Sequence, residues 1–185
     1  MRAGRRFSLA ISEGDGISVV AEVDGPNAAR RAEADGAEGV LVRSGRAEQL
    51  AQIREAVSVP ILFSWEGEDA DRLSGADACI IDVEYAHVEL GDRFELALRV
   101  GDEEQLEEAL ERFDPELFVL AAGDEQGLGR VLDLLSDVPA GKLAIAELRT
   151  TSRADVEELE RAGVDAVIVR TGSIADLIGE PPPEV

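Results

Sequence analysis

Apolar residues along the chain gather in eight short runs, and the segments between them are polar or carry apolar residues at helical spacing. Within each run the residues are continuously apolar rather than alternating, which is typical of parallel strands covered on both faces. The runs are 17–23, 39–44, 59–65, 77–83, 95–100, 116–122, 142–148 and 165–171. The pattern therefore predicts eight buried, parallel strands.

Amphipathic helices are predicted between many of these runs, because apolar residues recur there every three or four positions among acidic residues. One helix start is marked by Ser152, which is followed three residues later by Asp155, the spacing of a capping box. The predicted helices are 28–36, 47–58, 102–113, 128–137 and 152–163.

The joints between helix and strand repeat along the chain as GAEGVLV, GADACII and GVDAVIV. We expect Gly36, Gly75 and Gly163 each to end a helix in the left-handed conformation that glycine adopts without strain. Strands that alternate with helices through repeated joints predict an α/β fold, a (β/α)8 TIM barrel. The alternative is an open doubly wound sheet. It is less favoured, because eight evenly spaced strands with no long connection between them are more typical of a closed barrel.

The chain is short for such a barrel, with 185 residues against about 250 in a typical one. Between the fourth and fifth strands only residues 84–94 are available, too few for a full helix, and residues 67–75 allow about two turns after the third strand. We therefore predict a compact barrel over 17–179 with its fourth helix reduced or missing. Residues 1–16 form an N-terminal arm and residues 180–185 a Pro-rich tail.

The net charge of the chain excludes two classes of binding partner. The net charge is −22, with 40 acidic against 18 basic residues, so the surface repels nucleic acid and anionic membranes and neither is expected as a partner. This acidity favours solubility or reflects adaptation to salt. The single Cys79 has no disulfide partner, and no run is long enough for a signal peptide or a membrane span. These features predict a cytoplasmic protein, and they define no oligomeric state.

Several stretches resemble the indole-3-glycerol phosphate synthase family, a phosphate-binding barrel of tryptophan biosynthesis. They include ISVVAEV before Gly25–Pro26, SVPIL, GADACII, RVGDEEQLEEAL and residues 143–173, so that the resemblance spans about residues 7–179. It implies a barrel with its active site at the C-terminal ends of the strands, here called the mouth.

The residues that match the family's catalytic positions are few. Glu22 and Glu147 match the glutamates of the first and seventh strands, and they are the candidate catalytic residues. The first-strand lysine is replaced by Asp24, and the catalytic lysine of the third strand falls at Ser64. Other departures are Arg99 for the fifth-strand glutamate, Ala121 for the sixth-strand asparagine, and Leu148, Arg149 and Arg170 in the phosphate cup.

Lysine content tests the family's chemistry directly. Lys142 is the chain's single lysine and opens the seventh strand, so it belongs to the end opposite the mouth, roughly 20 Å away. Arginine cannot replace a lysine acid, because it does not release its proton near neutral pH. The sequence therefore predicts that neither the family reaction nor lysine-based aldol chemistry takes place.

Charged residues remain at the predicted mouth and suggest two hypotheses. In the first, acids and arginines satisfy one another in a noncatalytic barrel, which acts as a scaffold or binds a small anionic metabolite. In the second, a lyase or isomerase uses Glu22 and Glu147 as acid and base on a phosphorylated small molecule. The candidate ligand-binding residues are Arg43, Asp82, Arg99, Arg149, Arg170, Thr171 and Gly172.

Other candidate groups are weaker indications of function. Glu22, Asp24, Asp82 and Glu147 could hold Mg²⁺, but the interleaved arginines disfavour it, and we predict neither a metal nor a cofactor. The single histidine, His87, is expected on a solvated loop. Trp65 ends the third strand and is expected to pack at the barrel lip.

Overall fold

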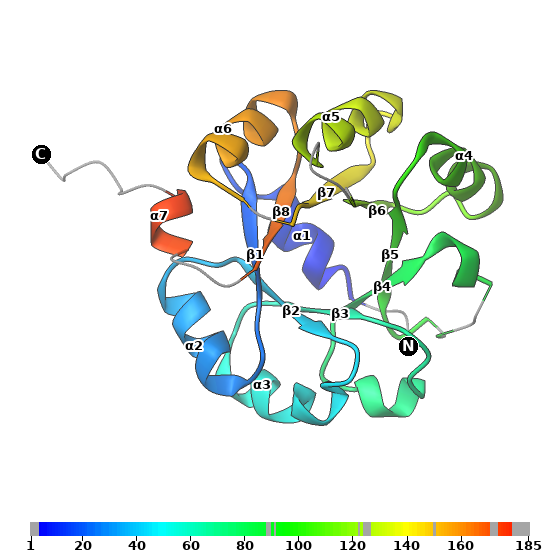
Figure 1. Ribbon diagram of the computed structural model, residues 1–185. Coiled ribbons are helices and arrows are strands. Elements are labelled where there is room, and N and C mark those ends of the chain that lie inside the picture. The colour runs from blue at the N-terminus through cyan, green and yellow to red at the C-terminus, as the bar shows by residue number, and fades with distance from the viewer. Residues whose placement is uncertain are drawn as a thin grey trace, which may run out of the picture.

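Eight parallel strands close into a barrel in chain order, with β8 paired to β1 (Figure 1). The structure, a computed structural model, describes residues 4–87, 90, 92–121, 123, 127–149, 151–170 and 174–178. The closed sheet confirms the predicted (β/α)8 barrel and excludes the open doubly wound alternative. The strands are β1 (Ser18–Glu22), β2 (Gly39–Arg43), β3 (Ile61–Ser64), β4 (Ala78–Asp82), β5 (Glu95–Val100), β6 (Leu117–Ala121), β7 (Leu143–Glu147) and β8 (Ala166–Val169).

Helices surround the strands as an outer ring (Figure 1). The predicted start of α6 is confirmed, because Ser152 Oγ accepts from the Asp155 amide at 3.2 Å while Asp155 Oδ2 accepts from the Ser152 amide at 2.8 Å. Gly163 ends the same helix with a left-handed φ of 94°. The helices of the ring are α2 (Pro26–Ala34), α3 (Leu50–Ala56) after the 3₁₀ turn η1 (Ala47–Gln49), α4 (Glu103–Arg112), α5 (Gly127–Asp137), α6 (Arg153–Ala162) and α7 (Ile174–Ile178).

Two crossovers are reduced to 3₁₀ turns. The β4–β5 connection has η3 (Val83–Tyr85) and no α-helix among its described residues, which confirms the predicted loss of the fourth helix. The β3–β4 connection has only η2 (Ala70–Leu73), within the two turns that its length allows. Gly75 is also not left-handed; a Cβ there would lie 2.9 Å from the Leu50 carbonyl oxygen, so glycine lets this connection pack closely on α3.

The barrel interior is filled with apolar side chains. Alternate strand residues point inward, and one inward layer is fully buried, with no member more than 1% exposed. A barrel packed in this way has no internal channel, so chemistry is confined to its ends. The layer comprises Val20, Leu41, Leu62, Ile80, Ala97, Val119, Ile145 and Ile168.

The N-terminal arm contributes a helix, α1 (Arg6–Ser12), that closes the end of the barrel opposite the mouth. Phe7 and Ile11, 0% and 2% exposed, belong to the same apolar cluster as the inward layer, and Figure 1 shows α1 at the centre of the ring. Glu95, at the start of β5, accepts from the amides of Phe7 at 2.6 Å and Ser8 at 3.2 Å. The helix start is thereby fixed to the sheet.

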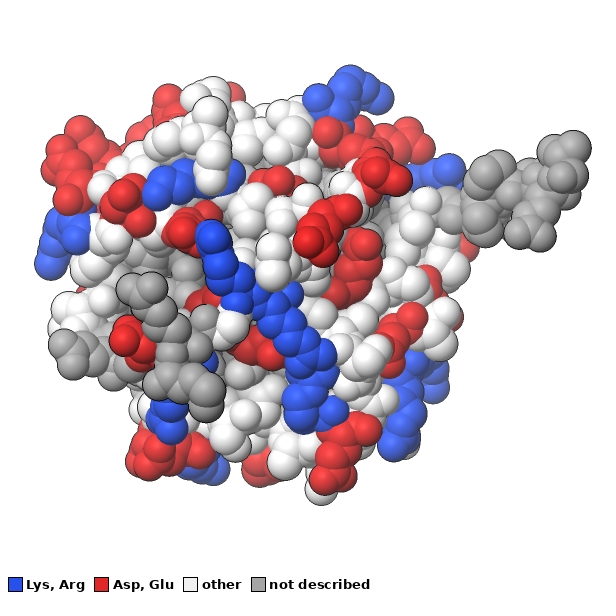
Figure 2. Space-filling view, turned by 180° about the vertical axis from the view of Figure 1, so that it is seen from behind, with Lys and Arg blue, Asp and Glu red and all other residues white. Residues whose placement is uncertain are grey.

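Arginines next to α1 are paired with acids at the strand starts. Arg5 pairs with Glu116, and Arg6 Nη1 lies 3.2 Å from Asp77 Oδ1. The face seen from behind carries a diagonal band of basic side chains among acidic ones (Figure 2). Within the described part of the chain, no helix combines the length and the apolar character needed to cross a membrane.

Replacing Phe7 with alanine should destabilise the fold by about 3–5 kcal/mol, because it removes a fully buried ring and leaves a cavity beneath the inward layer. The matched control is Leu9→Ala on the same helix, since Leu9 is 48% exposed and its loss should change stability by only about 0.5 kcal/mol. Urea denaturation of both variants measures the difference. Equal midpoints would show that α1 does not close the barrel.

Candidate functional site

Each strand places one inward-facing residue at the mouth, one layer above the apolar interior. The strand register aligns Arg43 with Ser64, Asp82 with Arg99, and Ala121 with Glu147. Glu22 ends β1 and Arg170 follows β8 directly. The sequence pattern alone predicts that these residues face inward, because they share the inward parity of their strands. The register offsets other neighbours by two residues, since Glu22 pairs with Leu41 and Glu147 with Ile168.

Six of these side chains form a continuous series of ion pairs, here called the mouth network: Arg170, Glu22, Arg43, Glu147, Arg99 and Asp82. The series alternates in charge and is formally neutral. Its successive N–O distances are 3.6 Å (Arg170 Nε–Glu22 Oε2), 3.1 Å (Arg43 Nη2–Glu22 Oε2), 3.5 Å (Arg43 Nη2–Glu147 Oε1), 3.0 Å (Arg99 Nη2–Glu147 Oε2) and 3.2 Å (Arg99 Nη1–Asp82 Oδ1).

The mouth network is buried at its centre and exposed at its ends. The Glu147 and Arg99 side chains are only 12% and 17% exposed, whereas Asp82 and Arg170 are 41% and 51% exposed. Partial burial alone would lower the pKa of Arg43, but its hydrogen bond to Glu22 and the negative charges of Glu147 and Glu22 raise that pKa overall. Arg43 is therefore held as a cation between two carboxylates.

Arg99 also contacts the end of β3. Its Nη2 donates to Ser64 Oγ at 3.3 Å. Its Nε is buried and has no hydrogen-bond partner among the described residues. A buried donor left unpaired costs about 1–3 kcal/mol, so Arg99 is held in place by its pairs with Glu147 and Asp82 rather than by complete hydrogen bonding.

The remaining residues predicted from the sequence lie outside the mouth network. Arg149 is exposed, and Asp24 is exposed with its carbonyl oxygen accepting from Arg46 Nη1 at 3.2 Å. Thr171 and Gly172 fall outside the described residues, so their ligand-binding roles stay predictions. Lys142 lies at the start of β7, where its Nζ is 2.6 Å from Asp114 Oδ1.

Two loop residues have the environments that the sequence predicts. Trp65 is partly buried against the core, and its Nε1 donates to the Glu68 carbonyl oxygen at 2.8 Å. His87 is exposed on the β4–β5 connection. Neither side chain joins the mouth network.

Glu68 is a residue at the mouth rim that the sequence did not single out. Its carboxylate accepts from the Ser44 hydroxyl, from the Glu66 amide at 2.9 Å and from the Gly45 amide at 3.3 Å. Partial burial would raise the pKa of Glu68, but these hydrogen bonds outweigh that effect and lower it. The carboxylate thus joins the loops after β2 and β3, a link between distant residues that no sequence spacing reveals.

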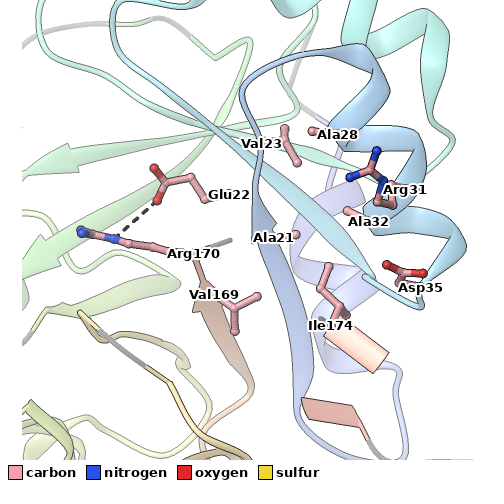
Figure 3. Close-up of a pocket in the computed structure, with 10 residues that line it drawn as sticks. All are labelled: Ala21, Glu22, Val23, Ala28, Arg31, Ala32, Asp35, Val169, Arg170 and Ile174. Carbon is pink, nitrogen blue, oxygen red and sulfur yellow. Dashed lines mark ion pairs between the residues drawn. The ribbon is translucent and has the colours of Figure 1, made fainter. Parts of the chain in front are cut away.

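A crevice of about 150 Å³ lies beside the exposed end of the mouth network, between β1, α2, β8 and α7. Its walls are mostly apolar, and they include Ala21, Ala32 and Val169. Figure 3 shows Glu22 and Arg170 pointing toward each other, with Arg31 and Asp35 on the far side of β1 along α2. Glu22 and Arg170 also line the crevice, so the exposed end of the mouth network forms part of its wall.

Among the described residues the mouth offers arginine donors, carboxylates and the Ser64 hydroxyl, which accepts from Arg99. Cys79 is fully buried, and burial, assisted by the charge of Glu68, raises its pKa to about 12, so its thiol stays protonated at neutral pH. The described residues contain no group of three or more His, Cys, Asp or Glu side chains that could hold a metal ion. The arrangement is suited to binding anions through arginine.

These features define a (β/α)8 barrel with a charged mouth. The chain is 29% identical over 147 residues to indole-3-glycerol phosphate synthase from Leptothrix cholodnii, covering 70% of this chain and 56% of that protein. It thus spans about half the length of this curated relative. No protein-family profile matches the chain.

A solved structure with the same fold is phosphoenolpyruvate phosphomutase from Streptomyces platensis subsp. rosaceus. It has a TM-score of 0.65 and 16% sequence identity, and the match covers 89% of this chain and 80% of that one. The likeness shows the barrel fold. Together the comparisons support a place among TIM barrels.

Glu147→Gln should destabilise the protein by about 2–3 kcal/mol, because two arginines would lose a charged partner in a mostly buried setting. Glu22→Gln should cost only about 1 kcal/mol, since Arg43 keeps its pair with Glu147. Denaturation midpoints of both variants measure these effects.

The control for this pair is Glu157→Gln, which removes an exposed partner of Arg153 on α6 and should cost about 0.5 kcal/mol or less. If Glu147→Gln stabilised the protein instead, the mouth network would not be a structural feature, and a functional role for Glu147 would be favoured.

Proposed function

We propose that this protein is a noncatalytic barrel, a shortened and degenerate relative of indole-3-glycerol phosphate synthases, and that its mouth binds a small anionic metabolite. The observation that carries the proposal is the mouth network, in which three arginines and three carboxylates pair with one another. Arg99 and Ser64 meet where the resemblance would place a catalytic lysine. No lysine reaches this end of the barrel.

Arg170 is the group best suited to receive the anion. It is 51% exposed, and its ion pair with Glu22 is the longest of the series at 3.6 Å. An ion pair as exposed as this contributes little to stability, so Arg170 can turn its planar donors toward a phosphate or carboxylate. Glu22 would keep Arg43 as its partner, and the rest of the network would not change.

The competing function is a lyase or isomerase that uses Glu22 and Glu147 as acid and base on a phosphorylated small molecule. Each carboxylate lies within 3.1 Å of an arginine nitrogen, so both are already engaged in ion pairs within the protein. An acid or base must instead reach the proton of a bound substrate. The network therefore supports the noncatalytic proposal better.

The purified protein should give no indole-3-glycerol phosphate from the family's carboxyphenylamino-deoxyribulose phosphate substrate, because no side chain at the mouth can act as the lysine acid. A fluorescence assay for the indole product, run beside an active indole-3-glycerol phosphate synthase, tests this. Measurable turnover above the buffer control would refute the noncatalytic assignment.

Anion binding should appear as thermal stabilisation by ribose 5-phosphate, inorganic phosphate or an aromatic acid. A ligand at a hundred times its dissociation constant stabilises the fold by about 2.7 kcal/mol. Arg170→Gln should abolish the shift, whereas Arg153→Gln, at an exposed arginine on α6, should leave it intact.

The three ligand classes give distinct outcomes. A shift with any of them that is lost in Arg170→Gln supports the proposed site. No shift with any of them in the wild-type protein would overturn anion binding at the mouth. Consumption of the phosphosugar, followed by NMR, would favour the isomerase instead.

A further inference from the structure

The reduced β4–β5 crossover leaves a cavity on the outer face of the barrel. In a (β/α)8 barrel each strand is normally followed by a helix that covers the sheet, but here η3 is followed by connecting residues. A cavity of about 350 Å³ lies over β5, with Leu96, Leu98, Phe113 and Ala86 among its walls. We call it the β5 groove.

The β5 groove has the size and composition of a ligand site. Its volume exceeds the 150 Å³ of the crevice beside β1 and falls in the range of about 300–1,000 Å³ that is typical of small-molecule pockets. Leu96 and Leu98 point outward from β5, opposite in parity to Arg99, so the groove is separate from the mouth. Its location is independent of the proposed anion site.

One end of the groove is charged, and the charge is unbalanced. Glu95, Glu116 and Arg5 line it, a formal charge of −1, and the Glu95 carboxylate also accepts from the Phe7 and Ser8 amides. The Arg5 and Glu116 side chains are 65% and 63% exposed, and an ion pair that exposed rearranges at little cost. Glu116 can therefore accept a hydrogen bond from a second cation.

The net charge of the whole protein has the same sign as the charge at this end of the groove. A net charge of −22 attracts cations and repels anions, including a second copy of the same chain. We propose that the β5 groove binds a small amphiphilic cation, a primary ammonium group on a short apolar or aromatic body. The body packs on Leu96, Leu98 and Phe113, and the ammonium group donates to Glu116.

Three probes with one apolar body and different heads test the ligand class: 3-phenylpropylammonium, 3-phenylpropan-1-ol and 3-phenylpropanoate. Calorimetry should give the ammonium probe about tenfold higher affinity than the carboxylate probe, with the alcohol between them. In wild-type protein with labelled methyl groups, the ammonium probe should shift the NMR signals of Leu96 and Leu98. Equal affinities for the three probes, absence of binding, or shifts confined to other methyl groups would each overturn the proposal.

Two variants test the site itself. Ala86→Phe should fill the groove and weaken all three probes, because it adds a ring to the wall without removing core atoms. Glu116→Gln should weaken the ammonium probe by about threefold and leave the alcohol unchanged. The matched control is Glu157→Gln, which alters a comparable exposed pair on α6 and should change neither affinity.

Stability and self-association complete the test. If Ala86→Phe does not fold, the methyl shifts and Glu116→Gln decide the outcome without it. Concentration-dependent dimerisation of the wild-type protein that Ala86→Phe abolishes would assign the groove to a second copy and overturn the small-cation proposal.

Discussion

The pairing of Arg43 with two carboxylates is the interaction on which the mouth depends. Arg43 extends from β2 to Glu22 on β1 and to Glu147 on β7, so a single guanidinium links strands that are not neighbours in the sheet. Charges at this depth are stable only when each has a partner of opposite sign. Glu147 in turn holds Arg99, and Arg99 holds Asp82. Changing Arg43, Glu147 or Arg99, which each hold two partners at the centre of the series, therefore affects the pairing of their neighbours.

The two ends of the barrel are closed by different physical means. At the bottom, Phe7 and Ile11 of α1 bury apolar surface against the inward layer. At the top, most inward positions are charged and pair with each other. The interior is therefore complete although the chain is short. What the chain omits lies outside, where the third and fourth crossovers are 3₁₀ turns. Loss of an outer helix leaves the strand pairing intact and places a cavity, rather than a helix, over part of β5.

Strand pattern and parity made the barrel and much of the site predictable. Continuous apolar runs predicted all eight strands. The strand ends placed Glu22, Arg43, Asp82, Arg99, Glu147 and Arg170 at the mouth, but they placed Asp24 and Arg149 there too, and both are exposed outside the network. The partners of these side chains were not predictable, because Arg43–Glu147 and the Glu68 contacts join residues far apart in the chain. The closing of the barrel bottom by α1 was not predicted, because Phe7 and Ile11 form only a short apolar pattern after an arginine-rich start. Gly75 was misread because close packing on Leu50, rather than a left-handed turn, requires it.

Charge acts at different ranges in the two proposed sites. At physiological salt the Debye length is about 8 Å, so distant surface carboxylates are largely screened and Arg170 can hold an anion through direct contact alone. The net charge of −22 nevertheless opposes the approach of that anion and slows its association, an effect that added salt reduces. At the β5 groove the local carboxylates and the net charge have the same sign, so added salt weakens both the approach and the contact of a cation. Opposite responses of the two association rates to salt follow from this one charge distribution.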